Sequence, residues 1–414
     1  MRVSSTVLLI ASCCTSAMSQ DPELEKSVSR ELSVLGSFVE LKNGVSDQIR
    51  EDLKDVVRKE SDDSDGTTFI FGYIPASVLD VMLKSLDKRL SNSNRIKAYK
   101  ADLSARRTFH RKSSASALML MVDRAVGVHG DQWDKLLKEI NDLAEQDRLP
   151  PIFSIESWKP DEAATAAFAR VLTPEQLASL KANLDLTRQD SFSNRMYRES
   201  DEQRSEKIKA ELKRLAAVQT RWLQQELKLR PQQVRRLELA GKGALHSVLS
   251  DRIAAENKLR GDLKKGHMDP SNEETKFAMV DQARLLTRHS RWRMFVLSSL
   301  DEQQKTDFRR IERTRASFER EADVDQFVIS LSREMTLNAT QLKKLRKLVS
   351  SKVPPLKPGQ WSTWLDGYIA MASATENAVI AAVGQDNSAI ARTDLDRIRG
   401  MVTLKSEGED KAAP

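Results

Sequence analysis

Apolar residues recur at helical spacing through most of the chain, most clearly between residues 200 and 230. One seam there follows steps of four and three residues through Ile208, Leu212, Leu215, Trp222 and Leu229, with the polar residues Gln219 and Glu226 at the remaining steps. This spacing places the apolar side chains on one face of a single helix of roughly 30 residues. The seam predicts packing in a helical bundle or hairpin. A continuous parallel coiled coil is disfavoured, because heptad order does not continue beyond Pro231.

Prolines mark the ends of the predicted helices, because proline breaks a helix interior and is tolerated in the first turn. Between Pro174 and Pro354 only two of the 12 prolines occur, and the sequence there predicts helices at 231–264 and about 272–300. Alternating β-branched runs are nearly absent, and only residues 67–74 have an extended pattern. We therefore predict an all-α fold, an elongated bundle of long antiparallel amphipathic helices.

The N-terminal region is predicted to contain a helix and a loop. Residues 20–58 have the pattern of an amphipathic helix with a break near residues 43–44, and residues 59–67 form an acidic linker. Part of this linker resembles a calcium-binding loop, but its twelfth position would be Gly72, where a bidentate glutamate is required. The linker is therefore predicted to be a solvated loop.

A strong helix start lies at Leu172 to Gln176. Thr173 can cap the helix, Pro174 suits its first position, and the Gln176 side chain can reach back to the cap backbone. Strings with leucine and, four residues later, glutamine recur at 229–233, 300–304 and 337–341. Ordinary helix capping explains all four strings and requires no function.

This helix start also carries a resemblance. Leu172, Thr173 and Gln176 match the LTxxQ string of small periplasmic stress proteins and chaperones, which this segment resembles. Members of that family are curved helical cradles that hold unfolding client proteins. The resemblance therefore implies a client-holding or envelope-stress role.

A broader resemblance covers about residues 215–375. It rests on the repeated leucine–glutamine helix starts, the string Leu239 to Gly243, the pair Pro354-Pro355 and the string Gly359 to Trp361. In these features the chain is similar to exported, helix-rich bacterial proteins of planctomycete type. That resemblance implies export and a helical fold, and no particular activity.

One helical module is predicted to occur twice. In both copies a helix (133–149 and 337–353) is followed by two prolines, by tryptophan and by an alanine-rich stretch (162–170 and 370–383). An old duplication and convergent helix packing explain this similarity equally well.

The predicted divisions of the chain are a signal peptide at 1–19, an N-terminal helical region at 20–115, a helical module at 116–190, a central long-helix hairpin or bundle at 191–324, a C-terminal helical module at 325–404 and a disordered tail at 405–414.

The first residues have the three-part pattern of a secretory signal peptide. A positive start at Met1-Arg2 precedes an apolar centre at 7–11 and a small-x-small site at 17–19. Cys13 ends a string similar to the lipobox of bacterial lipoproteins, so it is a competing candidate for a lipid anchor. No later window reaches the ~18 apolar residues that a membrane span requires. We expect an exported protein, periplasmic or secreted, with membrane contact only through the signal peptide or this anchor.

The charges nearly balance, with 67 Lys and Arg against 60 Asp and Glu. Basic clusters such as 309–315 are interrupted by acidic residues or lack interleaved aromatic residues. This pattern favours solvated helix faces over a nucleic-acid surface, and no nucleic-acid partner is expected. Binding to an acidic cell-surface polymer is left open.

The sequence offers no candidate catalytic, cofactor-binding or metal-binding residues. No His-Glu-x-x-His motif and no i, i+4 pair occurs among the five histidines, His110, His129, His246, His267 and His289. Gly241 to Gly243 lacks the flanking glycines and the preceding strand of a phosphate loop, so it is predicted to be a helix break or a close-packing point. Cleavage after Ser19 would also remove both cysteines, Cys13 and Cys14, which excludes thiol catalysis.

These observations favour a non-enzymatic helical interaction or scaffold protein of the cell envelope, with protein partners or unfolded clients. The alternative is an exported hydrolase with an unrecognised active site. A charged cluster with His110, His129 or His246 in a deep pocket would favour that alternative.

Overall fold

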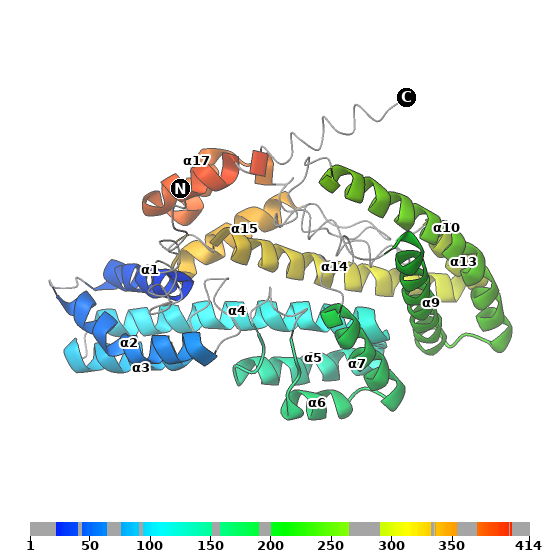
Figure 1. The fold of residues 1–414 in the computed structure, drawn as a ribbon, viewed down its shortest axis with the longest axis horizontal. Coiled ribbons are helices and arrows are strands. Elements are labelled where there is room, and N and C mark those ends of the chain that lie inside the picture. The colour runs from blue at the N-terminus through cyan, green and yellow to red at the C-terminus, as the bar shows by residue number, and fades with distance from the viewer. Residues whose placement is uncertain are drawn as a thin grey trace, which may run out of the picture. The chain divides into compact units, whose positions relative to one another are not determined.

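Helices make up nearly all of the structure. The computed structural model describes residues 22–39, 44–63, 76–90, 94–150, 158–189, 200–264, 290–332, 335, 337–353, 371–396 and 398–399. Helix accounts for 87% of the structure, and no strand occurs in these ranges (Figure 1). The predicted all-α class is therefore confirmed. The extended pattern at 67–74 lies outside the described residues, and the predicted elongation stays a prediction.

The chain divides into two compact units. Unit 1 comprises residues 1–106 and 332–339, and unit 2 comprises residues 107–331 and 340–414. Helix α4 (Asn94–Val126) belongs to both units and runs without a break past residue 115, where a division was predicted. The finer division of the chain stays a prediction.

Unit 1 packs three helices against the first part of α4. They are α1 (Pro22–Phe38), α2 (Val45–Asp63) and α3 (Ala76–Arg89). The predicted break between the first two helices is present, and Gly44 turns the chain there with a φ of 86°. The largest fully buried side chains of this unit form one core and are Leu35, Ile49, Leu53, Met82, Leu86 and Tyr99.

The prediction of an acidic linker at 59–67 is wrong for residues 59–63. Helix α2 continues to Asp63, so residues 59–63 are helical. The reason is local: no proline or glycine occurs between the start of α2 and Gly66, so nothing in the sequence stops the helix earlier. The remaining linker residues lie outside the described part.

A buried ionic cluster holds unit 1 together. Arg106 of α4 donates two hydrogen bonds to the Glu31 carboxylate of α1, at 2.8 and 2.6 Å, and a third to Asp102 at 2.8 Å. The Tyr99 hydroxyl donates to the same Glu31 at 2.6 Å, and the backbone N–H of Ala339 donates to Asp102 at 2.6 Å. Burial alone would lower the pKa of Arg106, but the bonds to these carboxylates raise it above its usual value.

Unit 2 contains the second part of α4 and the remaining helices. These are α5 (Gly130–Glu145), α6 (Glu162–Ala169), α7 (Pro174–Gln189), α9 (Asp201–Glu226), α10 (Pro231–Lys264), α13 (Ser290–Ser299), α14 (Glu302–Ser332), α15 (Ala339–Lys352), α17 (Glu376–Val383) and the short 3₁₀ helix η3 (Gln385–Asn387). One apolar core lies among α4, α5, α6 and α7, and another among α9, α10, α13 and the start of α14. No helix in the described ranges is both long and apolar enough to cross a membrane.

Helices α9 and α10 form the predicted long hairpin, and α10 has the predicted bounds. The apolar seam of α9 is buried as expected, with Ile208 and Trp222 exposing 0% and 5% of their surface. Gly241 does not break α10. A Cβ added there would lie 3.2 Å from the Trp292 ring of α13, so this glycine is a close-packing point. Of the third predicted helix, 272–300, the described part is α13.

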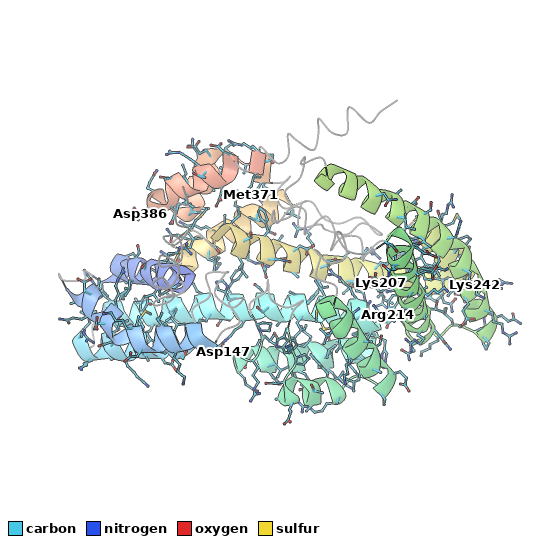
Figure 2. All side chains as sticks on the ribbon, viewed as in Figure 1. Asp147, Lys207, Arg214, Lys242, Met371 and Asp386 are labelled. Atoms are coloured by element: carbon cyan, nitrogen blue, oxygen red, sulfur yellow. The ribbon has the colours of Figure 1, made fainter. Side chains whose placement is uncertain are left out.

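Helix α5 ends at Glu145, four residues before the predicted Leu149. Asp147 takes a left-handed conformation with a φ of 55°, and the Arg148 N–H bonds back to the carbonyl of Leu143 at 3.0 Å. This is the hydrogen-bond pattern of a Schellman motif, which closes a helix. Arg107 and Arg111 of α4 donate to the Asp147 carboxylate at 2.6 to 2.8 Å, which holds the turn against α4. Asp147 is labelled in Figure 2.

Candidate functional site

The end of α4 is where the described part of unit 2 concentrates its buried charges. The chain turns there at Gly127, which has a φ of 67°. A Cβ at this position would lie 3.0 Å from Trp222 Cβ and 3.1 Å from Val218 Cγ1, both on α9. The left-handed conformation favours glycine, and the close approach to α9 leaves little room for a Cβ. The turn therefore brings α4 directly onto α9.

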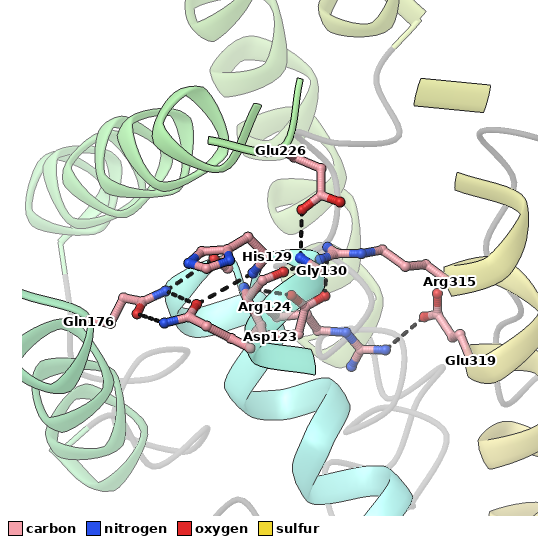
Figure 3. A network of polar contacts seen from close by, with 11 residues as sticks. Asp123, Arg124, His129, Gly130, Gln176, Glu226, Arg315 and Glu319 are labelled. Carbon is pink, nitrogen blue, oxygen red and sulfur yellow. Dashed lines mark hydrogen bonds and ion pairs between the residues drawn. The ribbon is translucent and has the colours of Figure 1, made fainter. Parts of the chain in front are cut away.

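Asp123 of α4 is the central acid of this site. Its Oδ1 accepts from the Val128 N–H at 2.9 Å, and its Oδ2 accepts from Arg315 Nη1 of α14 at 2.9 Å (Figure 3). Arg315 Nη2 also donates to the Val128 carbonyl. Burial raises the pKa of Asp123 above its ordinary value, although the positive charge of Arg315 works in the opposite direction. Both carboxylate oxygens are thus engaged within the protein.

The Arg315 guanidinium contacts two tryptophan rings. Its central carbon is 4.4 Å from the ring centre of Trp222 on α9 and 5.1 Å from that of Trp133 on α5. Cations are attracted to aromatic faces at these distances, and more strongly where water is excluded. Trp133 in turn meets the Phe318 ring edge-on at 5.4 Å. One side chain of α14 thereby ties α4, α5 and α9 together.

Two further acids complete the network (Figure 3). Glu226 is one of the two polar positions in the apolar seam of α9. It accepts a hydrogen bond at 2.7 Å from the N–H of Gly130, the first residue of α5. A carboxylate in this position is stabilised by the helix dipole. Arg124 of α4 donates to Glu319 of α14 at 2.7 Å, and Glu319 is only 2% exposed. Each of these acids therefore joins two helices.

Beside this network, two buried glutamines pair their side-chain amides. Gln132 and Gln176 are each the third residue of a helix, α5 and α7. Each amide nitrogen donates to the oxygen of the other, at 2.8 and 3.0 Å. Gln132 also donates to the Val171 carbonyl at 2.9 Å, and Gln176 donates to the Gly127 carbonyl at 3.3 Å. The pair thus connects the first turns of α5 and α7 to each other and to the backbone that precedes each helix.

The same arrangement recurs at the starts of α10 and α14. Gln233 and Gln304 are again third residues of their helices, and Gln233 Nε2 donates to Gln304 Oε1 at 2.7 Å. Gln233 also donates to the Ser299 carbonyl at 2.9 Å, and Gln304 to the Leu227 carbonyl at 3.1 Å. Each glutamine oxygen accepts its own cap N–H, at 3.0 and 3.1 Å.

A related join connects α15 to η3. Gln341 and Asn387, the third residues of these helices, both donate to the Val383 carbonyl, at 2.7 and 3.0 Å. Between them, Gly384 has a φ of 88°, and a Cβ there would lie 2.6 Å from Gln341 Nε2. The described part of the chain therefore contains three joins between two helix starts, and in two of them the side-chain amides bond to each other.

Sequence reasoning found four of these six helix starts and missed two. The starts at Val128–Gln132 and Val383–Asn387 have valine in place of leucine, and the second also has asparagine in place of glutamine. All six leading apolar residues are buried, with at most 7% exposed: Val128, Leu172, Leu229, Leu300, Leu337 and Val383. A search for any buried-type aliphatic residue followed four positions later by an amide would have found all six.

The structure places the predicted cap residues inside the first join. Leu172 is buried, Thr173 Oγ1 accepts from the Gln176 N–H at 3.3 Å, and Gln176 Oε1 accepts from the Thr173 N–H at 3.0 Å. These are the two bonds of a capping box. The candidate lipid anchor, Cys13, lies outside the described residues.

The histidines of the described ranges are not brought together. His110 and His129 are separated by most of the second part of α4, about 24 Å of helix. His246 is exposed on α10, and the other two histidines lie outside the described residues. Within the described part, no group of three or more His, Cys, Asp or Glu residues could hold a metal ion.

The first glutamine pair gives a test of these joins. Gln132→Leu should lower the free energy of unfolding by about 2–3 kcal/mol, because it leaves the Gln176 amide and the Val171 carbonyl buried without their partner. Chemical denaturation followed by circular dichroism measures this loss. The exposed Gln303→Leu on α14 is the control and should change stability by less than about 0.5 kcal/mol. Equal losses in the two variants would contradict a structural role for the pair.

Asp123, Arg315 and the two glutamine pairs form hydrogen bonds with one another or with the backbone at helix ends. These bonds connect helices that are far apart in the sequence. Comparison of the chain with family models, curated proteins and solved structures gave no match.

Proposed function

We propose that this chain is an exported, non-enzymatic helical scaffold of the cell envelope that binds other proteins, and specifically that it holds unfolding clients. The observation that carries the proposal is the use of the buried polar groups of unit 2. Asp123, Arg315 and the glutamine pairs all hold helices together, which is the role of a framework. The proposed export rests on the signal-peptide pattern of residues 1–19.

Two exposed apolar side chains support the client-holding form of the proposal. Leu239 of α10 is 68% exposed and Met294 of α13 is 57% exposed, and these two helices pack against each other. Methionine is flexible and polarizable, and it is common on surfaces that bind varied partners. The resemblance of Leu172 to Gln176 to the LTxxQ string points to the same role.

Suppression of client aggregation tests this function. We expect the purified protein, at a stoichiometric ratio, to reduce light scattering by citrate synthase during thermal unfolding. Replacing both exposed apolar side chains, in Leu239→Ser/Met294→Ser, should remove at least about half of this effect, because the client would lose its apolar contacts.

The matched control replaces polar neighbours on the same two helices, in Glu238→Gln/Ser298→Ala, and should act like the original protein. Unchanged scattering with the original protein in stoichiometric excess would remove the client-holding proposal.

A further inference from the structure

Helix α15 carries positive charge without any acidic residue. Its 14 residues include five cations, Lys343, Lys344, Arg346, Lys347 and Lys352. The longer helices of the same unit, such as α9, α10 and α14, mix both signs of charge. The charge of α15 is therefore not the ordinary surface pattern of this protein.

Two of the five cations have a structural explanation. Arg346 donates to Asp325 at 2.5 Å and to Glu321 at 2.7 Å, both on α14. Arg320 of α14 also bonds to Glu321 at 2.7 Å, so these two acids are already neutralised by two arginines. Lys352 lies in the last turn of α15, where a cation is favoured by the helix dipole.

The other three cations have no such explanation. Lys343, Lys344 and Lys347 are exposed, and none bonds to an acidic side chain in the described part of the protein. Lys343 and Lys347 are four residues apart and Lys344 and Lys347 are three apart, so the three charges are neighbours on one face of the helix. Like charges at this spacing repel and weaken a helix. An anionic partner would remove this repulsion.

The exposed face of α15 that carries these lysines has features that favour one class of anionic partner over others. Thr340, Lys344, Lys347 and Ser351 follow one line along α15 over about 16 Å, and all four are exposed. The Thr340 hydroxyl at one end can bond to polar groups of a ligand, whereas the Ser351 hydroxyl at the other end donates to the Leu348 carbonyl at 2.7 Å. Lysine is a mobile point charge that binds an anion without fixed geometry. A flexible, repeating anion suits this line better than a single rigid one.

Two other anionic partners fit less well. Within this line there is no aromatic side chain for base stacking, which single-stranded nucleic acid binding uses. The line also has no apolar side chain to enter the boundary of a lipid bilayer, as amphipathic membrane helices do.

We propose that Lys343, Lys344 and Lys347 form a binding face for a linear acidic polysaccharide, whose carboxylate or sulfate groups neutralise the three lysines. The choice of a polysaccharide draws on the proposed envelope location, but binding by the purified protein does not depend on client-holding activity. A negative result in the polysaccharide-binding assay therefore does not contradict the client-holding proposal, and a negative result in the client-aggregation assay does not contradict polysaccharide binding.

The test measures binding of the full-length protein to polygalacturonate and to dextran sulfate, with neutral dextran as the blank, at several salt concentrations. The variant Lys343→Gln/Lys344→Gln/Lys347→Gln should bind at least about tenfold more weakly. The slope of log affinity against log salt should also fall by about two, because each ionic contact contributes about 0.7–0.9 to such slopes with other polyanions.

The matched control removes three exposed cations from other helices of the same unit, in Lys213→Gln/Arg235→Gln/Lys242→Gln. This variant changes the total charge by the same amount. It should nevertheless keep its affinity within about twofold, because none of its three residues lies on α15. Equal losses in both variants would overturn the proposal in favour of diffuse net charge. Absence of binding to both acidic polymers would also overturn it. Tighter binding to poly-dT, or to vesicles of phosphatidylserine and phosphatidylcholine, would reassign the face to nucleic acid or membrane.

A single substitution separates binding from folding. Lys343→Glu places a glutamate four residues before Lys347, which is the favourable order for an ion pair on a helix. We expect this variant not to unfold at a lower temperature and yet to lose affinity for polygalacturonate. A loss of affinity accompanied by a lower unfolding temperature would show that the lysines serve the fold, and would overturn the proposal.

Discussion

Replacing Arg315 with leucine should lower the free energy of unfolding of unit 2 by about 3–5 kcal/mol. The substitution removes the hydrogen bond to Asp123 at 2.9 Å and leaves that buried carboxylate without its cation. It also removes the contacts of the guanidinium with the Trp222 and Trp133 rings. The exposed Arg310→Leu on the same helix is the control, and it should cost less than about 0.5 kcal/mol because surface ion pairs contribute little.

The stability lost in Arg315→Leu should depend on pH, because Asp123 can be charged or neutral and its pKa decides which form is present. Burial raises this pKa in the folded protein, so the contribution of Asp123 to stability is fully present below the pKa it has in the unfolded chain and is lost as pH rises through the folded pKa. Without Arg315 the carboxylate loses its nearest cation, so its pKa should rise further. The deficit of Arg315→Leu should therefore be smaller at pH 4 than at pH 7 in denaturation experiments. A deficit that grows on acidification would contradict this account.

Arg106→Leu should have a comparable or larger effect on unit 1. Arg106 is the shared cation of Glu31 and Asp102, whose side chains are only 7% and 8% exposed. Removing it leaves two buried carboxylates close together, and breaking even one buried pair costs about 3–5 kcal/mol. Because the chain has two compact units, hydrogen exchange of α1 and α4 should be measured alongside global denaturation.

Two further variants show what a smaller change does in the same place. Tyr99→Phe removes only the hydroxyl bonded to Glu31, so it should cost about 1.5–3 kcal/mol, the usual range for a hydrogen bond to a charged group. Arg95→Leu changes an exposed arginine on the same helix and should leave exchange in α1 unaltered. Faster exchange confined to regions outside unit 1 in Arg106→Leu would contradict the proposed role of this cluster.

The helices themselves were largely predictable, because helix formation depends on neighbouring residues. Pro231 suits a first helical turn, and the helix that it begins has the predicted bounds, 231–264. The seam through Ile208 and Trp222 gave the buried face of α9 correctly. Errors occurred at helix ends: the end of α2 was placed too early although the local sequence contains no stop before Gly66, and the end of α5 depends on a distant contact. Asp147 ends α5 in a left-handed turn that arginines of α4 hold, and nothing near Asp147 in the sequence indicates those arginines.

The glutamine pairs mark the limit of local reasoning. The sequence predicts that Gln176 reaches back to its own cap, and the structure has that bond and the equivalent bond of Gln304. Their second bonds go to Gln132 and Gln233, which lie 44 and 71 residues away. An amide has donors and an acceptor, so one side chain can serve its own cap and a second helix together. Only packing decides which second helix it meets.

The sequence by itself determined the all-α class, the hairpin of α9 and α10 and the apolar faces, since these follow from side-chain spacing over one or two helical turns. The tertiary structure alone decided how polar groups are used. Asp123 and Arg315 are 192 residues apart and meet where burial raises the pKa of the acid and two tryptophan rings contact the cation. A buried charge requires a partner, and the chain supplies it through packing between helices that no local pattern records.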